Sequence, residues 1–321
     1  MSSIDSITVK VVRKTAEAQD IASFELARTD GAPLPAFSAG SHIDVQVPGG
    51  LTRQYSLCND AGEQHRYRIA VLRDPASRGG SVGMHDAVKE GDEILISAPK
   101  NHFPLEHATE TLLFAGGIGV TPLLCMAQRL GKTGADFFMH YCTRSEDRTA
   151  FHKEICESAF ADKVQFHFDV GAEEQKLNLK KALGAPDAGK HLYVCGPSGF
   201  IDFVINTARA AGWGTAQMHL EYFGAAPQDT SNDGSFDVKI ASTGKSYTVG
   251  KDDNIIQVLK NNGIEILTSC EQGVCGTCIT RVLEGDIDHR DLYFTDDEKA
   301  ANDQFTPCCS RAKSKTLVLD L

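Results

Sequence analysis

The first hundred residues alternate between apolar and polar positions in short runs, which Gly, Pro and Asn-Asp turns separate. A period of two is typical of strands that bury one face. The runs cover Ser6–Val12, Asp20–Leu26, His42–Val47, Tyr67–Leu72 and Glu93–Ala98. Because the runs are many, short and evenly spaced, they favour an antiparallel β-barrel over a sandwich. The pattern therefore predicts a barrel domain over residues 1–103.

After residue 103 the pattern changes to continuous apolar runs that alternate with helical ones. Thr111–Ala115 is such a run and is typical of a buried parallel strand. A helix is expected from Thr121 to Leu130, with Thr121 as N-cap and Pro122 at the first helical position, where no N–H is needed. We also expect strands at Asp136–Cys142, Val164–Val170 and His191–Cys195, and a helix at Phe151–Phe160. The alternation predicts an α/β domain with a parallel sheet over residues 104–228.

A polar stretch rich in Gly, Pro and Ser, Gly224–Ser235, predicts a linker to a third domain. That domain, residues 229–321 with the linker, opens with a hairpin pattern at Phe236–Ile240 and Lys245–Val249. Asp252 and Asp253 then lead a helical pattern, where acidic residues suit the helix macrodipole. The 321 residues thus predict three domains.

Net charge and termini narrow the class of protein. The formal net charge of −11 argues against a nucleic-acid-binding surface, which would be basic. Residues 229–321 hold 16 acidic and 10 basic residues, so over half of the net charge lies there. No basic region followed by an apolar run opens the chain, and no apolar stretch approaches the roughly 20 residues of a membrane span. We therefore expect a cytoplasmic protein.

The chain has ten cysteines, of which five are scattered and five crowd near the end. The scattered ones, expected to pack as small apolar side chains, are Cys58, Cys125, Cys142, Cys156 and Cys195. Cys270, Cys275 and Cys278 follow C-x4-C-x2-C, and Cys308 lies thirty residues on. This spacing is the plant-type [2Fe–2S] signature, whereas zinc sites usually use paired C-x2-C spacings. Cys309 competes with Cys308 for the fourth position, and register favours Cys308.

On these residues, positions 236–321 resemble a plant-type ferredoxin domain with a β-grasp fold. The whole chain resembles the ferredoxin–NAD(P)H reductase superfamily with that domain fused at its end. It is most similar to the phthalate dioxygenase reductase-type family, the one-chain reductases of Rieske non-haem iron oxygenases, which include vanillate O-demethylase reductases. The resemblance implies a multidomain protein with a flavin barrel, a nucleotide domain and a ferredoxin domain. It also implies FMN, NADH and a [2Fe–2S] cluster.

The resemblance assigns a flavin site to the barrel. Arg53, Tyr55 and Ser56 match the family motif R-x-Y-S-L, which implies contacts to the flavin phosphate, the ring and N5 respectively. Arg suits phosphate because of its forked donors. The backbone of Ala70, Val71 and Leu72 would run along the ring, and Gly79, Gly80 and Ser81 resemble the phosphate loop. Because no adenine-binding extension accompanies that loop, FMN rather than FAD is expected.

The nucleotide site is expected at a glycine-rich turn between a strand and a helix, where a pyrophosphate can approach the backbone. Its residues are Gly116, Gly117, Gly119, Thr121 and Pro122. The second signature of the superfamily matches at Cys195, Gly196 and Pro197, and its closing segment matches at Glu221 and Phe223. The resemblance implies that Cys195 and Glu221 face the nicotinamide and Phe223 the flavin. A buried strand-end thiol is the alternative for Cys195.

Coenzyme choice is expected at Thr143 and Arg144, where the family contacts the adenosine ribose. An Arg there could bind the extra phosphate of NADPH, but the acidic Glu146 and Asp147 that follow disfavour it. The resemblance implies NADH. Ser56, Cys195 and Glu221 are the expected catalytic residues.

We therefore hypothesise a reductase that passes electrons from NADH through FMN to the [2Fe–2S] cluster and on to a Rieske non-haem iron oxygenase in aromatic catabolism. The oxygenase would act on an aromatic acid, phthalate-like or vanillate-like. The acidic third domain suggests docking to a basic patch on that partner. The alternatives are a stand-alone NAD(P)H diaphorase and a non-enzymatic iron–sulfur carrier.

Overall fold

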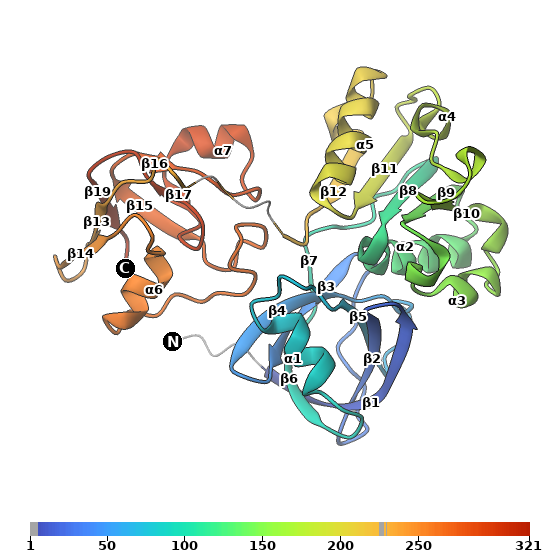
Figure 1. Cartoon of the computed structure of the whole chain (residues 1–321), viewed down its shortest axis with the longest axis horizontal. Coiled ribbons are helices and arrows are strands. Elements are labelled where there is room, and N and C mark those ends of the chain that lie inside the picture. Colours follow the sequence, from blue (N-terminus) through green and yellow to red (C-terminus); the bar gives the residue numbers. More distant parts are fainter. Residues whose placement is uncertain (1–5, 225–227, 229) are drawn as a thin grey trace. The chain divides into compact units, whose positions relative to one another are not determined.

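The computed structural model describes residues 6–224, 228 and 230–321, and the chain forms two compact units, Met1–Phe223 and Gly224–Leu321 (Figure 1). Expectations for the first five residues, and for linker positions 225–227 and 229, lie outside the described residues. Within the described residues, no helix is long and apolar enough to cross a membrane.

The first part of the first unit is the expected antiparallel barrel, with strand order β4-β3-β6-β1-β2-β5 and β7 paired with β3. Tyr67, Ile69 and Val71 of β5 face its core, together with Phe24 and Ile43. Asp20 turns the chain between β1 and β2 in the left-handed conformation, with φ 62°, which Asp tolerates better than most residues. The elements are β1 Ser6–Ala18, β2 Ile21–Arg28, β3 Ser41–Val47, β4 Leu51–Ser56, β5 Tyr67–Leu72, α1 Gly80–Asp86, β6 Glu93–Ser97 and β7 Lys100–Asn101.

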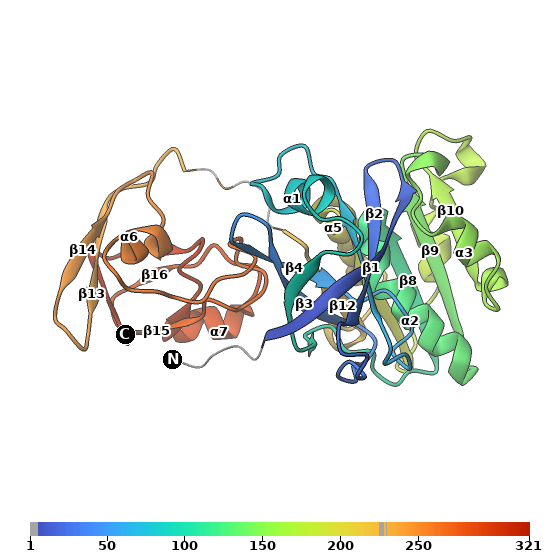
Figure 2. The ribbon, with the colours of Figure 1, turned by 90° about the horizontal axis from the view of Figure 1, so that it is seen from below.

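The second part of this unit is the expected parallel sheet, with order β10-β9-β8-β11-β12. Helices cover both faces of the sheet, α2 and α3 on one face and α4 and α5 on the other (Figure 1 and Figure 2). The elements are β8 Glu110–Gly116, α2 Val120–Thr133, β9 Phe137–Thr143, α3 His152–Cys156, β10 Val164–Phe168, α4 Leu179–Leu183, β11 Lys190–Cys195, α5 Ser198–Ala210 and β12 Met218–Glu221; short 3₁₀ turns lie at 117–119, 146–148, 161–163, 173–175 and 215–217.

The apolar run of β8 explains why the sheet is covered on both sides. Leu113 packs with Leu123 of α2, whereas Leu112 and Phe114 pack with Ile201 of α5. Successive side chains of a strand point to opposite faces, so a strand buried on both faces must be apolar throughout.

Several local expectations were wrong. A 3₁₀ turn at Gly117–Gly119 leads directly into α2, whose N-cap is Gly119, so Thr121 is not the N-cap and Pro122 is not the first helical residue. The Thr121 hydroxyl instead donates to the Ile118 carbonyl at 3.1 Å. The helix expected to reach Phe160 ends at Cys156, because turns replace its second half. Cys156 is exposed and does not pack in a core.

The second unit is a mixed sheet of order β14-β13-β19-β15-β17, with β16 and β18 paired beside it. The helix α6 places Ile255 and Leu259 in its core, and the N-cap is Asn254 rather than either leading Asp. This is the expected β-grasp domain. Its elements are β13 Phe236–Ile240, β14 Ser246–Val249, α6 Ile255–Asn261, β15 Thr280–Glu284, β16 Ile287–Asp288, α7 Asp296–Ala301, β17 Gln304–Phe305, β18 Arg311–Ala312 and β19 Thr316–Leu319.

Candidate functional site

Two glycine turns meet at the carboxyl end of the parallel sheet. A Cβ on Gly119 would overlap the Cys195 carbonyl and lie 2.6 Å from the Gly196 nitrogen. A Cβ on Gly196 would lie 2.9 Å from the Cα of Gly116. The two signatures predicted for nucleotide binding therefore lie backbone against backbone. Only glycine permits this approach, which leaves the turn surface open to a ligand.

The strand ends at this edge bring Cys195 and Glu221 together. Cys195 is in register with Ala115 on one side and with Glu221 on the other. Open α/β sheets bind ligands outside the carboxyl ends of their strands. The structure thus places both residues at the edge where a nucleotide is expected.

Ser56 of the barrel reaches the same place. Its hydroxyl donates to the Glu221 carboxylate at 3.4 Å, joining β4 to β12 across 165 residues. Burial raises the pKa of the Glu221 carboxyl to about 8, although the hydrogen bond from Ser56 opposes the shift. Burial first, and then the Glu221 charge, raise the pKa of the Cys195 thiol. The three predicted catalytic residues therefore form one cluster, in which Cys195 is a neutral thiol and Glu221 is largely protonated near neutral pH.

Arg53 and the predicted phosphate loop, both expected to bind the flavin phosphate, lie in contact at the start of α1. A Cβ on Gly80 would lie 2.8 Å from Cγ and Nε of Arg53, so the Arg53 side chain covers this turn. The predicted phosphate loop is the first turn of a helix, with Gly79 as N-cap at φ 98°. The Ser81 hydroxyl accepts the N–H of Asp74 at 3.1 Å. A guanidinium beside a glycine turn is a donor set that fits a phosphate.

The other residues expected to bind the flavin lie on β4 and β5. Tyr55 is partly buried against the barrel core, and burial raises the pKa of its hydroxyl. Ala70 and Val71 are buried, while Leu72 is partly exposed. Sequence reasoning missed His85, whose Nε2 lies 2.8 Å from the Val71 carbonyl. A helix–strand contact of this kind has no signal in the spacing of residues.

The structure does not place the remaining expected ligands in the cluster of Ser56, Cys195 and Glu221. Thr121 and Pro122 are buried in α2, and the hydroxyl of Thr143 shares a hydrogen bond of 2.7 Å with that of Thr149. Arg144 is exposed on the loop that follows β9. Phe223 is 40% exposed at the end of the first unit.

The four motif cysteines converge in the second unit. The Cys270 thiol lies close enough to those of Cys275 and Cys308 to interact with them, and the Cys278 thiol interacts with that of Cys308. The Gln272 N–H donates to the Cys270 sulfur at 3.3 Å. These contacts lower the pKa of the Cys270 thiol, the largest effect coming from Cys275. Four converging sulfurs with a backbone N–H donor fit an iron–sulfur cluster.

The glycines of this loop and the fifth cysteine support the same assignment. Gly276 has φ 69°, and a Cβ there would overlap the Tyr293 ring. Cys309 lies behind the loop against Gly273, and its sulfur is 3.3 Å from the Thr306 hydroxyl. Cys309 contacts Cys308, whereas Cys308 contacts two of the other motif cysteines. In the described part of the chain, no three His, Cys, Asp or Glu side chains are arranged to hold a single metal ion.

Asp233, near the end of the expected linker, forms ion pairs with two arginines of the second unit, to which it belongs. The sequence pattern did not predict these contacts. The Asp233 carboxylate accepts two hydrogen bonds from Arg290, at 2.9 and 2.5 Å, and lies 3.4 Å from Arg311. Its side chain is 5% exposed. An acidic residue in a polar stretch gives no sign that arginines about 60 and 80 residues later will contact it.

Known proteins are similar to this chain over nearly its whole length. The family model described as a 2Fe-2S iron-sulfur cluster binding domain matches residues 238–313. Vanillate O-demethylase oxidoreductase of a Pseudomonas species is 56% identical over 95% of this chain and 96% of its own. Phthalate dioxygenase reductase of Burkholderia cepacia is 39% identical over 98% and 97%.

A solved structure agrees with these relatives. It is phthalate dioxygenase reductase, described as a modular structure for electron transfer from pyridine nucleotides to [2Fe-2S]. It superposes with a TM-score of 0.80 at 39% identity and covers 99% of this chain and 98% of its own.

Proposed function

The chain belongs to the family of one-chain oxygenase reductases that includes vanillate O-demethylase oxidoreductase and phthalate dioxygenase reductase, and from this premise we propose its complete electron path. Electrons pass from NADH through FMN to a [2Fe–2S] cluster and then to a Rieske non-haem iron oxygenase. The observation that carries the proposal is the cluster of Ser56, Glu221 and Cys195, which joins the flavin barrel to the nucleotide sheet.

The residues of this cluster would make an uncharged place for hydride transfer. FMN, when bound, supplies the conversion of a two-electron donation into single-electron steps. The Glu221 carboxyl is largely protonated near pH 7, because burial raises its pKa to about 8. Cys195 is fully buried and neutral, so neither group places a charge beside the nicotinamide. Ser56 donates its hydroxyl to Glu221, which it orients, and this hydroxyl would lie near N5 of a bound flavin.

The remaining assigned residues hold the cofactors. Arg53 and the turn at Gly79 and Gly80 would bind the flavin phosphate, with Tyr55 against the ring. The turns at Gly116–Gly119 and Gly196 would carry the pyrophosphate. The residues that would hold the two irons are Cys270, Cys275, Cys278 and Cys308. Thr143 and Arg144 would lie near the ribose.

We divide the chain at 1–103 for FMN, 104–228 for NADH and 229–321 for the linker and cluster. We place the protein in the cytoplasm, because none of the ten cysteines, all of which lie in the described residues, forms a disulfide. An aromatic acid such as vanillate or phthalate is the proposed substrate of the partner oxygenase. The names of the relatives support this choice.

An anaerobic titration with NADH tests the electron path. NADH should bleach both the flavin and the cluster absorbance, because the flavin accepts two electrons and passes them singly to the cluster. The purified chain should carry two irons. A flavin spectrum without iron would overturn the proposal. Adding a purified vanillate oxygenase with vanillate should then accelerate NADH oxidation, which a stand-alone diaphorase would not show.

A further inference from the structure

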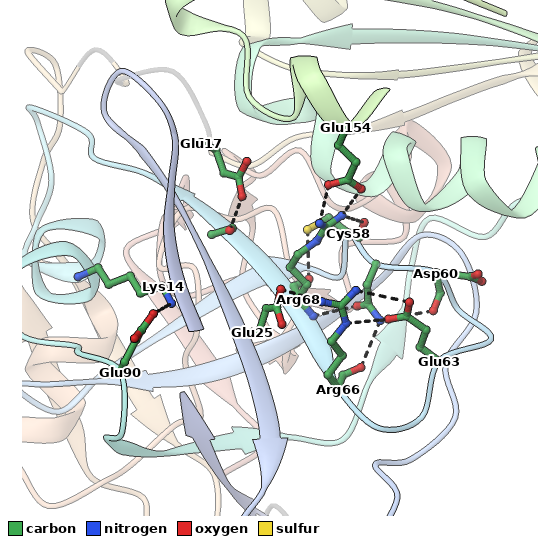
Figure 3. A network of polar contacts seen from close by, with 12 residues as sticks. Lys14, Glu17, Glu25, Cys58, Asp60, Glu63, Arg66, Arg68, Glu90 and Glu154 are labelled. Atoms are coloured by element: carbon green, nitrogen blue, oxygen red, sulfur yellow. Dashed lines mark hydrogen bonds and ion pairs between the residues drawn. The ribbon is translucent and has the colours of Figure 1, made fainter. Parts of the chain in front are cut away.

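A partly buried ion pair connects the barrel to helix α3 of the nucleotide domain. Arg68 of β5 forms two parallel hydrogen bonds with Glu154 of α3, at 2.6 and 2.7 Å (Figure 3). The Arg68 side chain is 9% exposed and that of Glu154 is 40% exposed. Two parallel bonds between a guanidinium and a carboxylate fix orientation as well as distance.

The alternation of β5 explains why Arg68 faces the nucleotide domain. Tyr67 and Ile69 point into the barrel core. Ala70 points the other way and packs, together with Cys58, into the core that surrounds α2. Arg68 shares the face of Ala70, because successive side chains alternate. An arginine at this position therefore meets α3 rather than solvent.

Arg68 also holds the segment that follows the flavin serine. Its guanidinium donates to the Cys58 carbonyl at 3.3 Å, and its own carbonyl accepts the Cys58 N–H at 2.8 Å and thiol at 3.2 Å. Cys58 lies two residues after Ser56, which donates to Glu221. A displacement of Arg68 would therefore move the backbone next to Ser56.

On the other side, the ion pair holds the loop between β9 and α3. Phe151 lies at the N-terminus of α3 with φ 60°, and its ring is 4.8 Å from the Arg68 guanidinium. A bulky residue keeps this left-handed conformation only where its surroundings enforce it. The same loop contacts the barrel again, where the Gln19 N–H donates to the Asp147 carbonyl at 2.8 Å.

We propose that Arg68 is a positioning residue for hydride transfer. Through Glu154 and Phe151 it holds the loop 144–151, which carries the proposed ribose contact, at a fixed place relative to Ser56. The inference rests on the proposed function. A partly buried ion pair contributes little net stability, because desolvation and solvent screening offset its attraction. Geometry is therefore the main contribution expected of this pair.

Arg66 offers a matched control, since it lies two residues away and also forms ion pairs. Its guanidinium is 2.7 Å from Glu25 and 3.0 Å from Glu63, and both partners belong to the barrel (Figure 3). Arg66→Met therefore removes a comparable charge and comparable ion pairs without touching the nucleotide domain. Arg68→Met, Arg68→Lys and Glu154→Gln complete the set.

The experiment is anaerobic stopped-flow reduction of the flavin by NADH in the full holoenzyme. It yields a limiting rate constant for flavin reduction and an amplitude. The amplitude reports the fraction of enzyme that carries a reducible flavin. Amide hydrogen exchange of peptides that cover residues 144–157 gives a readout that does not depend on turnover. We expect Arg68→Met to lower the limiting rate constant at least tenfold with unchanged amplitude, because small misplacements of reacting groups slow transfer strongly.

The other variants test whether the lost ion pair causes the slower flavin reduction. Arg68→Lys, which keeps the charge without the fork, should restore part of the rate, and Arg66→Met should stay within twofold of the unchanged enzyme. Exchange at 144–157 should accelerate in Arg68→Met and Glu154→Gln but not in Arg66→Met. An unchanged rate constant in Arg68→Met, or a loss confined to the amplitude, overturns the inference. Failure of NADH to reduce the unchanged enzyme would instead overturn the proposed function.

Discussion

Replacing Gly119 by alanine should separate the two turns that form the nucleotide edge. The added Cβ would overlap the Cys195 carbonyl and lie 2.6 Å from the Gly196 nitrogen. Both neighbours are backbone atoms of a buried strand end, so neither can rotate away. Since Cβ atoms essentially never approach closer than 3.0 Å, the nitrogen alone requires a shift of about 0.4 Å, and the carbonyl requires more.

The energetic consequence follows from this overlap. Overpacking of this kind typically destabilises by about 1–3 kcal/mol. For a unit of this size, each kcal/mol lowers the melting temperature by about 2–4 °C. The effect on hydride transfer should be larger, because a misplacement of about 1 Å can slow a reaction about a hundredfold. A shift of half that size should slow flavin reduction by NADH about tenfold.

The assay is stopped-flow reduction by saturating NADH together with thermal unfolding of the holoenzyme. Gly199→Ala is the control, because a Cβ there meets no atom within 4 Å and the position is helical. It should leave the melting temperature unchanged or raise it slightly. If Gly119→Ala kept both the rate constant and the melting temperature of the unchanged enzyme, the close approach of the two turns would not matter as argued.

Three further predictions concern protonation and cluster ligands. The folded-state pKa of Glu221 is raised from 4.5 to about 8, so its contribution to stability is complete below about pH 4.5 and is lost as pH rises through 8. Melting temperatures between pH 5 and 9 should therefore fall less steeply in Glu221→Gln, and parallel curves would contradict the shift. Burial lowers the pKa of His140 from 6.5 to about 4, so its contribution is present above pH 6.5 and is lost as pH falls toward 4. His140→Gln should lose less stability between pH 7 and 5, which urea unfolding at the two pH values can measure. Cys308→Ser should abolish iron binding and visible cluster absorbance, whereas Cys309→Ser should keep both; the reverse result would exchange their roles.

Local patterns predicted most of the fold, but they failed at one helix start and missed one helix altogether. The run in β8 and the hairpin of β13 and β14 were predicted because their periods report burial directly. The start of α2 was wrong, because a 3₁₀ turn takes the place that Thr121 would have capped. The helix α5, which covers one face of the sheet, was not predicted at all.

The candidate site divides in the same way. The four cysteines proposed to hold the cluster come from one loop and one further position, so their spacing alone suggested this role. No spacing pattern points to His85 or Asp233, because each contacts a residue that is distant in the sequence. His85 contacts the Val71 carbonyl and Asp233 the Arg290 side chain. The family motifs identified Ser56 and Glu221 separately, but no pattern indicated that they form a hydrogen bond.

The sequence by itself determined the order of the three folds, the cluster loop and the glycine turns, because periodicity and spacing are local properties of the chain. Only the tertiary structure decided which of these pieces meet. Ser56 and Glu221 are 165 residues apart and Arg68 and Glu154 are 86 apart. Their contacts depend on how the two sheets of the first unit pack against one shared core. That packing follows from the sum of many apolar contacts, which no single motif encodes.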